Sequence, residues 1–329
     1  MKTIQKLFAV AALGAALNAN ATSIFFFGDS LSDTGNTQLF LQSLRDPVTG
    51  ARTVPDSAIP TTQFPYANGQ YTDSFGGGVW SQQFAARLGT TATPSLTGGS
   101  NFAFAGARTY SSPGNVPGLG DQVGFYLTSP ISGARSNAAD LFVIMIGGND
   151  IQAALESGNA AAGLAAGLGN IRAAVGALYA DGARHFLIAN MPRADLTPRV
   201  QSFGAPTVAG FKGFEDAWNA NFNALIGGLS GALVGSDIDV LDLASLGSLT
   251  TAQFAAAGIT NTTDACFTAA AGTQMRVCRE SQYSDSFHPT SRAHTIIADL
   301  ALNAIPLPGT AALLGLGFLG FAALRRKAA

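Results

Sequence analysis

A serine stands where a parallel sheet would present it to a ligand. Ser30 follows residues 23–27, a short apolar run typical of a strand buried on both faces. Open α/β sheets bind their ligands at the carboxyl ends of such strands. Gly28 permits a sharp exit from the strand, and the polar run after Ser30 offers N-cap groups for a helix whose first amides would point back at Ser30. The positive end of that helix would stabilise the charge formed when the hydroxyl attacks a substrate.

A serine hydroxyl is a weak nucleophile until a base removes its proton, and the chain has three histidines that could do so. His288 lies at a loop boundary, and Asp285, three residues earlier, can turn its carboxylate onto the ring. Pro289 favours an extended His288 and suits the first position of a helix, so the imidazole can project from the helix start. His185 lies inside a predicted strand, and His294 is expected on the surface of the last helix. We therefore assign His288 as the base, with Asp285 orienting it.

Other serine chemistries lack their residues in this sequence. The pattern Gly-x-Ser-x-Gly is absent because residue 32 is serine. A Ser-x-x-Lys site is also absent, since Lys212 is the only lysine outside the two ends and residue 209 is alanine. The chain has no His-Glu-x-x-His pattern and no phosphate-binding glycine loop.

The elements that must position these residues alternate along the chain. Further strands are predicted at residues 100–107, 140–146, 184–190 and 238–242. Helices are predicted at residues 79–88, 159–180, 206–229 and 291–304, and residues 37–74, rich in Pro, Thr, Gly and Asn, are expected to form mainly a long loop over the cleft. A strand, a helix and a strand in succession form a parallel crossover unit. We predict one α/β domain with three layers, α/β/α, around a mostly parallel sheet.

Four segments resemble the blocks of the GDSL, or SGNH, family of serine esterases and lipases, in the expected order. They are residues 28–36, 100–107, 147–150 and 285–289. The resemblance implies that Ser30 is the nucleophile and that Gly106 and Asn149 join the Ser30 backbone amide in an oxyanion hole. It implies an SGNH hydrolase-like fold and a serine ester hydrolase, an esterase or lipase, which forms an acyl-enzyme on carboxylic esters.

Two other functions stay open. The same acyl-enzyme could pass its acyl group to an alcohol, which would make the protein an acyltransferase. The chain could also be a non-catalytic surface or matrix protein with a vestigial site. The neutral, aromatic-bearing loops suit a small-molecule or lipid ester with an uncharged acyl chain.

Both ends of the chain have the character of targeting segments. Residues 1–21 combine two lysines, an apolar stretch and Ala-Asn-Ala, the layout of a signal peptide, so the catalytic domain is predicted to span residues 22–304. Residues 305–329 hold an apolar segment followed by Arg-Arg-Lys, and they resemble a PEP-CTERM sorting signal, with Pro-Leu-Pro in place of Pro-Glu-Pro. This resemblance implies export in a Gram-negative bacterium to the cell surface or medium, with transient membrane association until a sorting protease removes the tail. A permanent short membrane anchor is the alternative.

Charge and cysteine content limit the partners. Five of the 18 Lys and Arg residues but none of the 20 Asp and Glu residues lie in these two ends, so the remaining domain carries a formal charge of −7. A nucleic-acid partner is therefore not expected, because nothing would neutralise phosphates. Cys266 and Cys278 are the only cysteines, and export favours a disulfide between them. No histidine lies near them in sequence, and we expect no metal and no cofactor.

Overall fold

The computed structural model describes residues 23–54, 66–67, 69–111, 116–129, 138–268 and 274–305. The predicted signal peptide, residues 1–21, lies outside the described residues. So does the predicted sorting tail, apart from Ile305.

A parallel sheet forms the centre of the domain. Its strands, in spatial order, are β1 (Ile24–Gly28), β2 (Leu141–Met145), β3 (His185–Ala189) and β4 (Asp237–Leu241). Gly28 lies opposite Met145, and Ala189 lies opposite Leu241, so the carboxyl ends of the strands meet at one edge. The four strands predicted from continuous apolar runs are confirmed to within a residue or two at each end.

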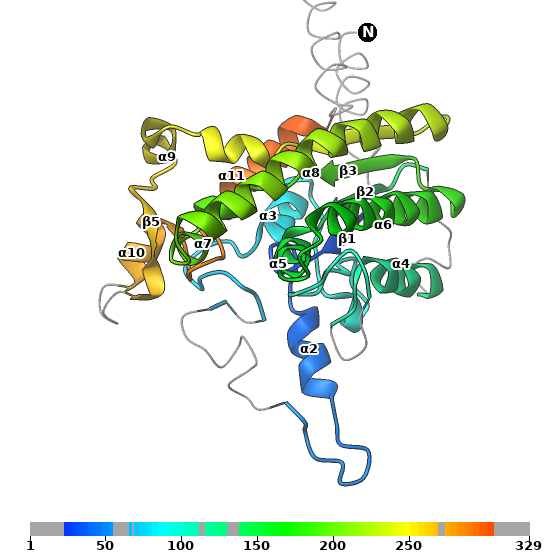
Figure 1. Ribbon diagram of the computed structural model, residues 1–329. Coiled ribbons are helices and arrows are strands. Elements are labelled where there is room, and N and C mark those ends of the chain that lie inside the picture. The colour runs from blue at the N-terminus through cyan, green and yellow to red at the C-terminus, as the bar shows by residue number, and fades with distance from the viewer. Residues whose placement is uncertain are drawn as a thin grey trace, which may run out of the picture.

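Alternating side chains of the strands build a separate core on each face of the sheet. Phe25 and Phe27 pack on one side, where α4 (Leu119–Thr128), α5 (Gly148–Glu156), α6 (Ala160–Ala180) and α8 (Ala205–Ala232) cover the sheet. Ile24 and Phe26 pack on the other side, against α3 (Trp80–Arg87) and α11 (Ser291–Ala304). Figure 1 shows α5, α6 and α8 in front of the sheet and α3 and α11 behind it. The predicted three-layer α/β/α architecture is confirmed.

Smaller elements surround this frame. They are α2 (Asn36–Ser43), α7 (Pro198–Gln201), α9 (Thr251–Ala256), α10 (Gln274–Glu280), the parallel pair β5 (Asn261–Ala265) and β6 (Ser281–Tyr283), and the short 3-10 turns η3 (Ser95–Thr97), η5 (Ala194–Leu196), η6 (Ala244–Ser248) and η7 (Cys266–Thr268). The predicted disulfide between Cys266 and Cys278 is present and joins η7 to α10. Both cysteines are buried.

The strand predicted at residues 100–107 is not a regular strand. Phe102 and Phe104 donate backbone hydrogen bonds to Phe26 and Gly28, so the segment does run beside β1. However, the N–H of Ala103 donates to the side chain of Asn101, and the ladder does not continue on the outer side. Only isolated bridges remain.

The loop predicted over residues 37–74 contains a helix, α2, which Figure 1 shows projecting from the body of the domain. The carboxylate of Asp33 accepts the N–H groups of Gly35, Asn36 and Thr37 and so caps this helix. The helix therefore begins six residues after Ser30. The prediction that its first amides point back at Ser30 was wrong, because Asp33 occupies them.

Candidate active site

Ser30, His288 and Asp285 form a hydrogen-bonded row. Nε2 of His288 lies 3.0 Å from Oγ of Ser30, and Nδ1 of His288 lies 2.7 Å from Oδ2 of Asp285. Ser30 occupies the turn after β1, whereas Asp285 and His288 lie in the loop between β6 and α11. Their order is that of a nucleophile, a general base and the carboxylate that fixes the tautomer of the base.

The carboxylate of Asp285 is held ionised by its surroundings. Burial by itself would raise its pKa, but the charge of His288 and the hydrogen bonds from His288 and from the Tyr66 hydroxyl outweigh that effect and lower the pKa of Asp285 to about 2. The other carboxylate oxygen accepts the backbone N–H groups of Phe287 and His288. A carboxylate with these donors remains an acceptor for the imidazole at any pH at which the imidazole can act as a base.

The three N–H donors predicted to form an oxyanion hole belong to Ser30, Gly106 and Asn149. The backbone N–H groups of Ser30 and Gly106 donate to no acceptor in the described part of the chain. Gly106 has a φ of +79°, which a residue with a side chain rarely adopts. Asn149, in the first turn of α5 directly after β2, donates one hydrogen of its amide to the carbonyl of Ala107 at 2.9 Å. Its second amide hydrogen remains for a substrate.

Buried polar side chains tie the loop of Ser30 to the loop of Gly106. The Asn36 amide donates to the carbonyls of Asn101 and Ala103, at 2.6 and 3.0 Å. The Asn101 amide in turn donates to the carbonyl of Ser32 at 2.7 Å. The N–H of Ala105 donates to the carboxylate of Asp33 at 3.0 Å. These contacts fix the spacing between the serine and the proposed donors.

Gln122 of α4 fixes the end of β1. Its Oε1 accepts the N–H of Gly28 at 2.8 Å, and its Nε2 donates to the carbonyl of the same residue at 2.9 Å. Gln122 is fully buried. No local pattern in the sequence points to Gln122 or to Tyr66, because their contacts join positions 94 and 219 residues apart.

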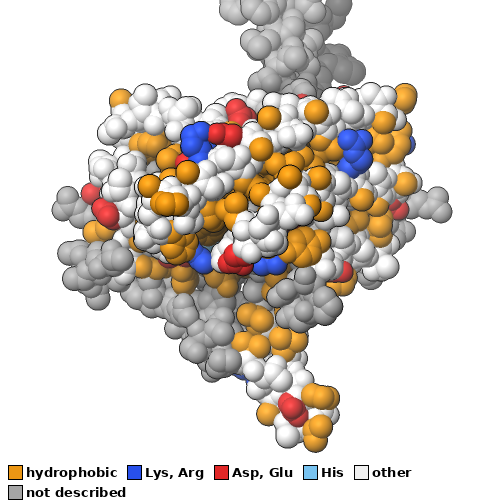
Figure 2. All heavy atoms as spheres, viewed as in Figure 1, with side chains coloured by type: hydrophobic (Ala, Val, Ile, Leu, Met, Phe, Trp, Pro, Cys, Tyr) orange, Lys and Arg blue, Asp and Glu red, His pale blue; other side chains and the backbone are white. Residues whose placement is uncertain are grey.

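A cavity of about 590 Å³ opens beside Ser30, Asp29 and Asn149. Its apolar lining includes Leu196, Leu243, Leu246, Leu249, Phe254 and Tyr283. Asp29 is buried at its wall, and burial raises the pKa of Asp29 to about 7. On the face of the molecule in Figure 2, hydrophobic side chains are more widespread than charged ones, which are scattered among them.

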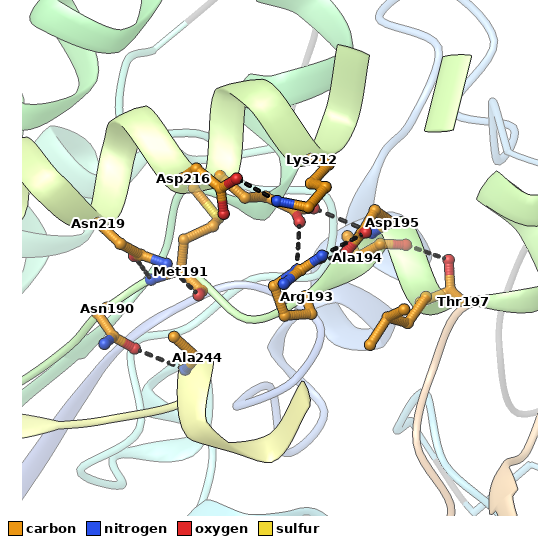
Figure 3. Close-up of polar contacts among 12 residues, drawn as sticks. Asn190, Met191, Arg193, Ala194, Asp195, Thr197, Lys212, Asp216, Asn219 and Ala244 are labelled. Atoms are coloured by element: carbon orange, nitrogen blue, oxygen red, sulfur yellow. Dashed lines mark hydrogen bonds and ion pairs between the residues drawn. The ribbon is translucent and has the colours of Figure 1, made fainter. Parts of the chain in front are cut away.

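One wall of this cavity is the segment that follows β3. Figure 3 shows how α8 holds it. Asn219 exchanges two hydrogen bonds with the backbone of Met191, at 2.8 and 3.0 Å. Arg193 donates two hydrogen bonds to the carboxylate of Asp195, and its Nε lies 3.3 Å from Oε2 of Glu215. Burial, together with Asp195, raises the pKa of Glu215 to about 9, so this buried side chain is uncharged at neutral pH.

The other two histidines lie away from this row. His185 begins β3 and lies 3.2 Å from Asp237. His294 is fully buried, so its predicted place on the helix surface was wrong. It shares one face of α11 with Ile297, Ala298 and Ala301, at positions i+3, i+4 and i+7, and that face packs on the sheet. Neither ring nitrogen of His294 has a hydrogen-bond partner among the described residues, and burial, with the charge of His288, lowers its pKa to about 3.

Comparison with known proteins adds three findings. A family model described as GDSL-like lipase/acylhydrolase matches residues 24–301, and a model described as PEP-CTERM protein-sorting motif matches residues 304–327. The chain is 30% identical over 200 residues to Lipase 1 of Photorhabdus luminescens, over 58% of this chain and 25% of that protein. The chain thus spans about a quarter of the length of this curated relative.

Two solved structures align with the chain over most of its length. The acetylxylan esterase Axe2 of Geobacillus stearothermophilus is 13% identical with a TM-score of 0.40, over 88% of this chain and 95% of that one. An extracellular lipase of Streptomyces rimosus is 17% identical with a TM-score of 0.37, over 87% of this chain and 100% of that one.

Proposed function

The chain belongs to the GDSL-like lipase/acylhydrolase family of enzymes, and on that premise we propose that it hydrolyses carboxylic esters through Ser30, His288 and Asp285. The observation that carries the proposal is the row of hydrogen bonds from the serine Oγ through the imidazole to the carboxylate. The nucleophile, the general base and the orienting carboxylate follow one another in the order that this mechanism requires.

The reaction follows from this geometry. Nε2 of His288 accepts the proton of Ser30 as Oγ attacks the ester carbonyl, while Asp285 accepts the hydrogen bond of Nδ1–H. The N–H groups of Ser30 and Gly106 and the Asn149 amide stabilise the tetrahedral oxyanion. His288 then donates its proton to the departing alcohol, which leaves an acyl-enzyme. Water, activated by the same imidazole, releases the acid and restores Ser30.

The apolar lining of the large cavity supports the proposal that the substrate is an ester with an uncharged acyl chain. It begins at Ser30, and five leucines and two phenylalanines are among the residues that line it. Burying an acyl chain there would gain roughly 0.8 kcal/mol for each CH₂ group removed from water. We therefore expect kcat/KM to rise with acyl length until the cavity is full.

The carboxyl-terminal PEP-CTERM motif indicates export and sorting to the cell envelope or surface. We further propose that residues 1–21 are a signal peptide. In this proposal the tail associates transiently with the membrane of a Gram-negative bacterium, until a protease removes it.

The test is turnover of p-nitrophenyl esters of graded acyl length. We expect Ser30→Ala and His288→Ala to lower kcat by at least about 10⁴-fold. His185→Ala should retain activity and is the matched histidine control, since His185 lies outside the row. Unchanged turnover by Ser30→Ala would contradict the proposal.

The same assay separates the alternative functions. An acyltransferase would yield more transfer product than acid when an alcohol or a glycan is added. A non-catalytic surface protein would turn over none of the esters.

A further inference from the structure

A second cavity, of about 150 Å³, adjoins the first. Gly148, Asn149 and Phe287 line both of them. Gly106 lines the second cavity only. An ester has an acyl part and an alcohol part on either side of its carbonyl. If the acyl part fills the apolar cavity at Ser30, the alcohol part meets this second one.

Two guanidinium groups line the second cavity, those of Arg108 and Arg199. Arg108 donates to the hydroxyl of Tyr110 at 2.6 Å, and Arg199 lies over the ring of Phe287, 5.7 Å from its centre. Each guanidinium has five N–H donors, so most of them remain unused. Both groups are therefore held in place by neutral neighbours.

Neither arginine has a carboxylate partner within the described ranges, and no Asp or Glu is among the described residues that line the cavity. The nearby Asp150 is buried and accepts the N–H and hydroxyl of Thr109. Burial raises the pKa of Asp150, and the charge of Arg108 offsets only part of that effect. The rest of the domain is acidic, since 20 Asp and Glu residues outnumber the basic ones. Two arginines that form no ion pair among the described residues, beside the reacting carbonyl, are thus a local exception.

We propose that this second cavity binds an anionic group, a carboxylate or a phosphate, on the alcohol part of the ester. The proposal rests on the proposed ester hydrolysis and names the substrate class of the same site. Guanidinium groups pair with the two oxygens of a carboxylate or phosphate through parallel hydrogen bonds, which would also orient the ester for attack.

The first test compares esters that differ only in charge. For the alcohol part, 4-(carboxymethyl)phenyl butanoate is compared with the neutral 4-(carbamoylmethyl)phenyl butanoate, and a phosphonomethyl analogue distinguishes phosphate from carboxylate. We expect kcat/KM to favour an anionic ester by about tenfold, and the preference to shrink as salt is added. For the acyl part, monophenyl glutarate should have no advantage over phenyl glutaramate. Equal rates in the first comparison, or a preference for the anion only in the second, would overturn the proposal.

The second test removes the guanidinium groups. The double variant Arg108→Gln/Arg199→Gln should bring the ratio between anionic and neutral esters to about one. Arg172→Gln, an exposed arginine on α6, is the matched control and should keep the preference. A double variant that keeps the full preference would show that these arginines do not bind the anion.

A binding measurement separates this proposal from the proposed hydrolysis. Titration of Ser30→Ala with 4-hydroxyphenylacetate and with 4-hydroxyphenylacetamide needs no turnover. Tighter binding of the anion, by about tenfold, supports the second cavity even if no ester is hydrolysed. Turnover of neutral esters with equal binding of both compounds would leave the hydrolase and remove the anion site.

Discussion

Asp285 accepts hydrogen bonds from four donors, and the imidazole of His288 supplies one of them. The Tyr66 hydroxyl shares Oδ2 with that imidazole. The Tyr66 ring contacts the Phe267 ring, with 4.8 Å between ring centres. It also contacts the ring of Tyr71. In the proposed mechanism Tyr66 is thus a positioning residue that acts through Asp285, and it has no described hydrogen bond to Ser30.

Tyr66→Phe should shift the pH dependence of activity. Without the hydroxyl, the Asp285 carboxylate loses a donor and becomes a stronger acceptor, so it stabilises the protonated imidazole more. The acidic limb of the kcat/KM profile should move up by roughly half a pH unit, with kcat changed by less than about tenfold. Tyr71→Phe is the control, because the Tyr71 ring contacts His288 but its hydroxyl makes no described hydrogen bond. Equal shifts in both variants would contradict this role.

Whether a residue of the site could be predicted from the sequence depended on how close it lies to a helix or strand that the sequence itself predicts. Ser30 and His288 could be placed because each follows or precedes a regular element within a few residues. The role of Tyr66 could not, since its contact with Asp285 joins positions 219 residues apart. The burial of His294 was readable, because its spacing to Ile297, Ala298 and Ala301 is helical.

Between β3 and α8, one arginine contacts two buried acidic side chains. Arg193 is the cation that faces both Asp195 and Glu215, and the side chains of those two residues are 4% and 0% exposed. Asp195 also donates its backbone N–H to Oε1 of Glu215 at 3.0 Å. Within this wall of the large cavity, Arg193 is thus the cation that pairs with the buried carboxylate of Asp195.

Two substitutions in this network should lower the free energy of unfolding by very different amounts. Arg193→Met leaves a buried carboxylate without its cation and should lower the free energy of unfolding by about 3 kcal/mol. Glu215→Gln keeps the volume and the acceptor of a side chain that is already neutral, so it should cost less than about 1 kcal/mol. Urea denaturation of both variants measures this. Similar losses in the two would mean that Glu215 is ionised in the folded protein.

Elements buried on both faces were the most predictable. β2 is apolar at every position and therefore reads as a strand without knowledge of its neighbours. By contrast, α2 depends on the capping carboxylate of Asp33 inside a stretch rich in Pro, Thr and Gly. The segment at residues 100–107 fails as a strand because the side chain of Asn101 takes the N–H of Ala103. Such competition between side chain and backbone is not visible in a hydrophobic pattern.

For the whole molecule, buried titratable groups act on stability in opposite directions. Asp29 and Glu215 have raised pKa values, about 7 and about 9, so the folded protein holds their protons, and their contribution to stability is lost as the pH rises. His294 has a lowered pKa, from 6.5 to about 3. Between these values the unfolded chain binds a proton that the folded protein does not, so its contribution is lost as the pH falls. The pH dependence of the unfolding free energy is therefore a sum of opposite contributions.

The variant His294→Leu isolates the contribution of His294 to this pH dependence. Relative to the unmodified chain, His294→Leu should gain up to about 1.4 kcal/mol of unfolding free energy for each pH unit below 6.5, because leucine has no proton to bind on unfolding. The gain should accumulate towards pH 3, wherever both proteins still fold. Urea denaturation at several pH values measures it, and Ile297→Val, a neutral change on the same helix face, should shift stability by a constant amount. A constant difference for His294→Leu as well would mean that the folded protein binds the imidazole proton as tightly as the unfolded chain does.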